Sequence, residues 1–137
     1  MAALGAVGRV ARRAVRTSSL GDPLPPARAE LLRLAFGRPG IGVAEAAAEL
    51  HLAPNSVSMM VSKLAEDGLL NRCRVANDGR SVRLTVTEAG AARVAQARDI
   101  HSDLAGRALE LLSPADREAI VAAIPALTRL AAQMEEL

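Results

Sequence analysis

The hydrophobic period changes from helical to alternating within residues 53–90, and this change restricts the fold more than any other feature of the sequence. In the first half, apolar residues recur three and four positions apart, which places them on one side of a helix. Pro54 suits the first helical position, and Gly68 supplies the left-handed residue that ends a helix. The spacing therefore predicts a helix of about three turns, a length that fits the major groove of DNA. Its apolar positions are Val57, Met60, Val61 and Leu64.

Two alternating runs, 70–75 and 82–87, follow this helix and flank a turn-forming segment, Ala76-Asn77-Asp78-Gly79. They predict a hairpin with one apolar and one basic face. Asp78 and Arg80 at its tip are two positions apart, so they share one side of the strand. A carboxylate there can hold the guanidinium extended, and an extended arginine suits the narrow minor groove. A helix for one groove and a hairpin for the next predict a winged helix-turn-helix.

The hairpin sequence, GLLNR followed by NDGRSVRLTVTEAG, resembles the multiple antibiotic resistance regulator (MarR) family. The resemblance extends over nearly the whole chain, because helices of family-like length flank the unit on both sides. Two positions depart from the family pattern. Met59 stands where the family often has Arg, which leaves the target DNA sequence open, and Ala53 replaces the usual Ser or Thr cap. The residues that fit the pattern are Gly68, Leu69, Arg72, Asp78, Arg80, Thr87 and Gly90.

The rest of the chain predicts a mainly α (α+β) fold. Residues 18–26 cannot continue a helix, since they contain three prolines and a glycine. Ile41 is the expected first strand of the wing sheet. Thr87 and Ser113 are suited to cap two helices, and Pro125 should bend the last one. The other helices are expected at 2–17, 27–36, 43–50 and 88–112, and from 114 onward.

Three of these helices, the first and the last two, carry apolar stripes that one small globule cannot bury. This pattern favours a two-fold partner, although a monomer could also pack the stripes into its own bundle. We therefore expect an N-terminal dimerisation helix at 1–20, a winged helix-turn-helix DNA-binding domain at 24–87 and C-terminal dimerisation helices at 88–137.

Composition agrees with a DNA-binding role without requiring it. The 137 residues are half apolar, which is enough for a core, and the net charge is +2. Arginines concentrate in residues 9–16 and in the hairpin, whereas the last third is net acidic, although solvated faces would give the same pattern. The single cysteine excludes an internal disulfide and favours a cytoplasmic protein. No apolar run is long enough for a membrane span. The acid-poor N-terminus also fits a transit peptide.

The residues expected to contact DNA lie on the polar side of the helix at 54–66 and on the hairpin. Asn and Ser can hydrogen-bond to base edges or phosphates, Met59 can contact a thymine methyl, and Lys63 and Arg72 suit phosphates. The alternative for the small polar residues is a solvated face, and strand arginines also blunt a sheet edge. The full set is Asn55, Ser56, Ser58, Met59, Ser62, Lys63, Arg72, Arg74, Asp78, Arg80 and Arg83.

Three further residues could carry chemistry. His101 lies on an apolar stripe, where the family resemblance implies a crevice for small ligands, but a satisfied interface histidine is the alternative. Cys73 could sense oxidants, although a lone strand cysteine is usually inert. His51 is expected in a turn. The sequence has no phosphate-binding glycine loop, nucleophile elbow or paired carboxylates, so we expect no enzyme, no cofactor and no metal.

These observations predict a transcriptional regulator, most simply a repressor, that binds a pseudo-palindromic operator in double-stranded DNA as a homodimer. The resemblance further implies release by a small-molecule effector, in which case DNA and effector must weaken each other's binding by the same factor. The alternative is a winged helix that binds a partner protein and has no specific DNA affinity.

Overall fold

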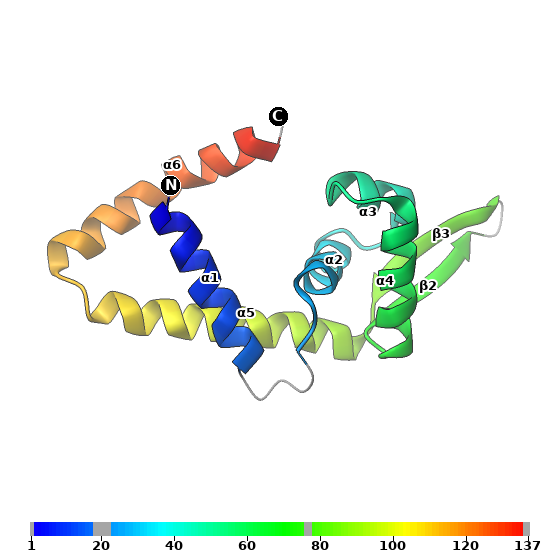
Figure 1. The fold of residues 1–137 in the computed structure, drawn as a ribbon, viewed down its shortest axis with the longest axis horizontal. Helices are drawn as coiled ribbons and strands as arrows, with labels where there is room; N and C mark the ends of the chain where they lie inside the picture. The colour runs from blue at the N-terminus through cyan, green and yellow to red at the C-terminus, as the bar shows by residue number, and fades with distance from the viewer. Residues whose placement is uncertain (1, 18–22, 76–77, 136–137) are drawn as a thin grey trace. The chain divides into compact units, whose positions relative to one another are not determined.

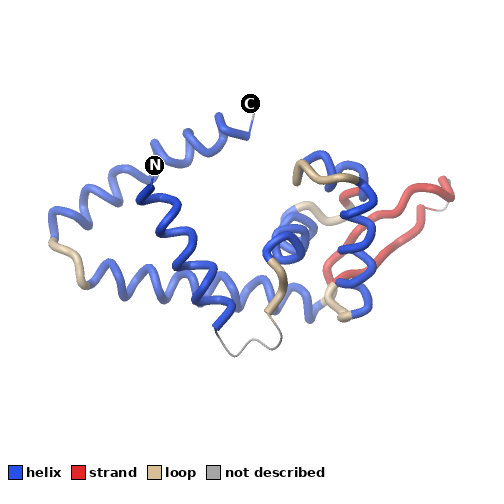
Figure 2. Tube along the Cα trace, viewed as in Figure 1, coloured by secondary structure: helices blue, strands red, loops and turns tan. Residues whose placement is uncertain are grey.

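The computed structural model describes residues 2–17, 23–75 and 78–135, and the side chains at 75, 78–81 and 135 are outside that description. The chain divides into two compact units, residues 1–101 and 102–137. Figure 1 labels the helices and strands, and Figure 2 separates them by type. The helices predominate over one small sheet, as the sequence predicts.

The first unit contains the winged helix-turn-helix. Three helices lead into the wing: α2 (Pro26–Gly37), α3 (Val43–Glu49) and α4 (Pro54–Glu66). Strands β2 (Leu70–Val75) and β3 (Asp78–Val86) form the wing, and the expected short strand β1 (Ile41–Gly42) completes the sheet. All pairing is antiparallel in the order β1-β3-β2, so β3 is central. The long helix α5 (Glu88–Glu110) follows the wing and extends into the second unit.

One hydrophobic core joins these helices to the sheet. The predicted stripe of α4 enters it, since Val57, Val61 and Leu64 are buried and Met60 packs at its margin. Leu84 of β3 is also fully buried. Burial of this side of α4 leaves the polar side of the helix exposed to solvent. The other core residues are Leu31, Leu32, Ala35, Ile41, Ala46, Ala47, Leu70 and Val94.

The junction between the wing and α5 is closely packed. The Thr87 hydroxyl accepts a hydrogen bond from the Gly90 N–H at 3.0 Å, as a helix cap does, and donates one to the Gly68 carbonyl at 2.7 Å. Gly68 itself has a φ of 72°, which explains the glycine at the end of α4. Gly90 is required for a different reason, because a Cβ there would overlap the Leu69 carbonyl.

Helix α1 (Ala2–Thr17) belongs to the first unit and has no buried residue. Its apolar residues Leu4, Val7 and Val10 are exposed. In the second unit, α6 (Pro114–Glu135) begins at the predicted cap, where the Ser113 hydroxyl accepts a hydrogen bond from the Asp116 N–H. Within the described ranges, no helix is both long and apolar enough to cross a membrane. The exposed apolar residues of α6 are Ile120, Val121, Ile124, Leu127, Leu130 and Met134.

Candidate nucleic-acid interface

Helix α4 presents a mixed polar and apolar surface to solvent. Asn55, Ser56 and Lys63 are exposed, Ser58 and Ser62 are half-buried, and Met59 is 75% exposed. An unbranched thioether side chain so far from the core does not contribute to packing. It instead gives α4 an apolar contact point among hydrogen-bonding groups, as a base-reading helix needs for a thymine methyl.

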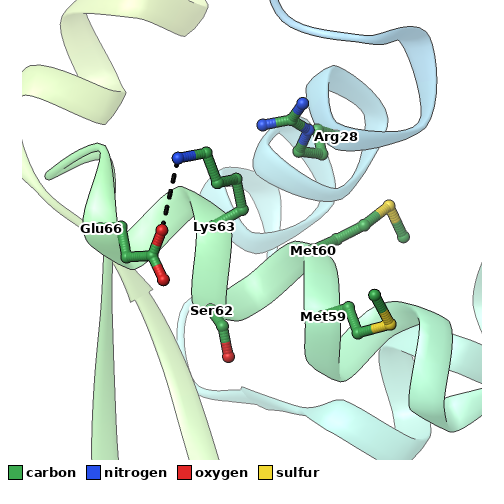
Figure 3. Close-up of a pocket in the computed structure, with 6 residues that line it drawn as sticks. All are labelled: Arg28, Met59, Met60, Ser62, Lys63 and Glu66. Atoms are coloured by element: carbon green, nitrogen blue, oxygen red, sulfur yellow. Dashed lines mark hydrogen bonds and ion pairs between the residues drawn. The ribbon is translucent and has the colours of Figure 1, made fainter.

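A shallow hollow of about 510 Å³ lies beside this helix (Figure 3). The two methionines lie along one part of it, while Arg28 of α2 and Lys63 of α4 supply positive charge. Sequence reasoning missed Arg28, whose signal was a basic residue in the first turn of α2. Its Nη1 atom lies 3.7 Å from an Asp67 carboxylate oxygen. The hollow therefore combines apolar and cationic groups at one place. It is lined by Arg28, Met59, Met60, Ser62, Lys63 and Glu66.

Lys63 is held between two carboxylates of its own helix end. Its ammonium lies 3.3 Å from Glu66 and 3.4 Å from Asp67. The hydrogen bonds to Glu66 and then to Asp67 raise the pKa of Lys63, so it is charged at neutral pH. The two carboxylates also offset part of the Lys63 charge. A DNA phosphate would therefore have to compete with them for the ammonium group.

Two arginines of the wing are tied to the helices. Arg72 of β2 donates to the Ser62 hydroxyl of α4 at 3.2 Å, so two predicted DNA contacts lie together. Arg83 of β3 donates to the Glu45 carboxylate at 3.1 Å and to the Gly40 carbonyl at 3.2 Å. Arg74 is exposed on β2. The predicted contact between Asp78 and Arg80 lies outside the described side chains.

Glu45 was not singled out by sequence reasoning, yet its carboxylate meets groups from three parts of the fold. It accepts a hydrogen bond from the Gly42 N–H at 2.9 Å, which completes a capping interaction at the start of α3. This bond, together with Arg83 and Arg38 and against a smaller cost of desolvation, lowers the pKa of Glu45. A glutamate three positions after a turn glycine was the available sequence signal.

Residues 24–82 match the sequence profile of the MarR family. This match spans 59 of the 137 residues. No curated protein matches this sequence. The match covers the helix-turn-helix and most of the wing, so the resemblance to the MarR family is confirmed over these residues.

Solved structures share the fold of this chain over most of its length. RV1404 from Mycobacterium tuberculosis is 20% identical, with a TM-score of 0.81. The alignment covers 93% of this chain and 86% of RV1404. FabT from Streptococcus pneumoniae, solved in complex with DNA, is 19% identical with a TM-score of 0.77 and coverages of 98% and 92%. A MarR family protein from Bacillus stearothermophilus is 20% identical with a TM-score of 0.77 and coverages of 96% and 86%. The predicted winged helix-turn-helix fold is thereby confirmed.

The two histidines and the cysteine have ordinary structural surroundings. The ring Nε2 of His101 lies 3.1 Å from the Ala11 carbonyl of α1, which agrees with a satisfied histidine. Cys73 is a free, exposed thiol on β2. His51 occupies the turn before α4 with a φ of 52°. In the part of the chain that the structure describes, no three potential ligands are grouped to hold a metal ion.

Proposed function

We propose that this protein is a sequence-specific DNA-binding transcriptional regulator of the MarR family that acts as a homodimer. The observation that carries the proposal is the outward face of α4, which is polar apart from Met59 and is fixed by burial of the opposite face. Met59, 75% exposed, offers an apolar contact among hydrogen-bonding groups, and base edges present thymine methyl groups for such a contact. The DNA complex of FabT, which has the same fold, supports this reading.

In this proposal α4 enters a major groove and the wing reaches the adjoining minor groove. Asn55, Ser56, Ser58, Met59 and Ser62 face the bases and nearby phosphates, and Lys63, Arg72, Arg74 and Arg83 strengthen backbone attraction. Arg80, oriented by Asp78, enters the minor groove, where the negative potential favours a guanidinium. In this arrangement α4 reads most of the base sequence, and the wing reads the shape of the minor groove.

The homodimer is supported by apolar faces that the described chain leaves exposed. Leu4, Val7 and Val10 of α1 and the apolar stripe of α6 have a large area in water. Exposed apolar surface of this extent marks an interaction site in a soluble protein. A two-fold partner would cover these faces and place two α4 helices on a pseudo-palindromic operator. Residues 24–87 then bind DNA, while 1–20 and 88–137 form the dimer.

Repression is the simplest output of such a dimer, because a protein that covers a promoter blocks access to it. A small effector would release it by favouring a dimer with a different spacing of the α4 helices. His101 is the residue we assign to the effector crevice. The same role places the protein in the cytoplasm.

Fluorescence anisotropy tests the proposal. The full chain is titrated against a duplex from its own upstream region and against a scrambled duplex, over a salt series. Wild type should prefer the first duplex, with a steep salt dependence, and Arg80→Ala should bind more weakly and flatten the slope by about one. Arg117→Ala, at an exposed position on α6, is the matched control and should behave as wild type. Equal weak binding to both duplexes would sink the proposal and favour a partner protein for the wing.

A further inference from the structure

The Glu45 cluster, which we define as Arg38, Gly42, Glu45 and Arg83, connects the wing to the helix-turn-helix. Glu45 Oε2 accepts from the Gly42 N–H at 2.9 Å and from Arg83 Nη1 at 3.1 Å. Its other oxygen, Oε1, lies 3.8 Å from Arg38 Nη2. A single carboxylate thus contacts the residue that follows α2, the residue that precedes α3 and a strand of the wing.

Arg83 is placed for this role by the sheet itself. Arg83 and Gly42 are Cα partners in the β1·β3 pairing, so the side chain starts beside the first turn of α3. The same nitrogen, Nη1, also donates to the Gly40 carbonyl at 3.2 Å. Nη1 therefore bonds to two acceptors within the protein. The arginine holds β3 against the segment that opens α3.

We infer that Glu45 sets the position of the wing relative to α4, acting through Arg83, and that Arg83 is a positioning residue and makes no DNA contact of its own. The inference rests on the proposed function, because the wing and α4 must reach adjoining grooves together. It also changes the part given to Arg83, from a source of positive charge for phosphates to a link between strand and helix.

The direction of the change in DNA affinity separates this inference from a purely electrostatic effect of Glu45. A carboxylate on a DNA-facing domain repels phosphates, so removing its charge should strengthen binding if charge alone mattered. If Glu45 positions the wing, removing its charge should instead weaken binding to the operator. Glutamine is the suitable replacement, since it still accepts the Gly42 N–H as a capping residue but no longer pairs with Arg83 as an ion.

The experiment measures operator affinity by anisotropy for the full-length Glu45→Gln, Arg83→Gln and double variants, each also in an Arg80→Ala background. Each single variant should bind about two- to fivefold more weakly, the effect of losing one exposed ion pair. The double variant should be no weaker than the single variants, because both changes break the same link. In the Arg80→Ala background these variants should lose no further operator affinity. Without Arg80 the wing lacks its minor-groove contact, so its position no longer affects binding.

Glu49→Gln is the matched control, because it removes one carboxylate charge from the same helix while the Glu45–Arg83 pair stays in place; Glu49 itself pairs with Arg38 at 2.9 Å. It should keep wild-type affinity, and thermal unfolding of every variant checks that the fold is retained. The inference is overturned if Glu45→Gln binds the operator as tightly as wild type or more tightly, or if Arg83→Gln lowers the salt slope by about one, as a lost phosphate contact does. It is also overturned if the losses multiply or persist without Arg80. A wild type that shows no operator preference instead overturns the proposed function, and this inference with it.

Discussion

Gly90 in the first turn of α5 lies so close to the Leu69 carbonyl that no side chain fits between them. Glycine normally weakens a helix, so the sequence alone suggests a poor first turn for α5. The structure shows instead that the close approach lets Thr87 bond to both Gly68 and Gly90. The end of α4, the wing and α5 are joined at this one point.

Gly90→Ala should therefore destabilise the protein by about 1–3 kcal/mol, the cost of forcing extra volume into a filled site. Gly106→Ala is the control, because Gly106 lies within the same helix with nothing within 4 Å of a Cβ. That change should stabilise by about 0.5–1 kcal/mol, since alanine is the better helix former. Urea unfolding of both variants measures the difference. Equal effects of the two changes would contradict the close contact.

Met59→Ala should lower operator affinity while leaving stability within about 0.5 kcal/mol of wild type, because the side chain is exposed. Replacing operator thymines by deoxyuridine removes only the methyl groups that Met59 is proposed to touch. Wild type should lose affinity at one such position in each half-site, and Met59→Ala should not. Fluorescence anisotropy measures the affinity of both proteins for the thymine and the deoxyuridine duplex. If wild type tolerates every deoxyuridine, the methyl contact is disproved.

Ile124→Glu should separate the homodimer into monomers, because it places a charge in the middle of the apolar stripe of α6. Arg129→Glu introduces the same side chain on the opposite side of the helix and should leave the dimer intact. Sedimentation velocity distinguishes the two species. A wild type that sediments as a monomer would contradict the dimer proposal directly.

Glu45 predicts a loss of stability in acid. Its pKa is lowered in the folded protein, chiefly by the Gly42 N–H, with Arg83 and Arg38 contributing. A lowered pKa means that the stabilisation is complete above the ordinary glutamate value, about 4.3, and is lost as pH falls through the folded value. Glu45→Gln should therefore show a shallower decline in melting temperature below that pH than wild type. Parallel curves would show that Glu45 carries no such linkage.

The sequence was sufficient for the elements whose signals are local. The spacing of Val57, Val61 and Leu64 predicted both the α4 helix and its buried side, and Ser113 marked the start of α6. The change to alternation predicted the wing strands. Each of these depends on residues within a few positions of one another, where period and capping chemistry act directly.

The Glu45 cluster was beyond sequence reasoning for the opposite reason. Glu45 and Arg83 are 38 positions apart and meet only because β1 pairs with β3 in one register. Arg28 reaches the hollow beside α4 through the packing of α2, which no local pattern specifies. The Asp78–Arg80 contact remains a prediction.

The central position of β3 has a consequence for synthesis on the ribosome. Strand β1 precedes β3 by about forty residues, and neither β1 nor β2 has a neighbour in the sheet until β3 is present. Leu84, which fills the core between them, arrives with the same strand. A nascent chain that ends before Leu84 therefore holds the helices of the DNA-reading half without the strand that closes their core. Completion of the domain should occur in one late step, when β3 leaves the exit tunnel.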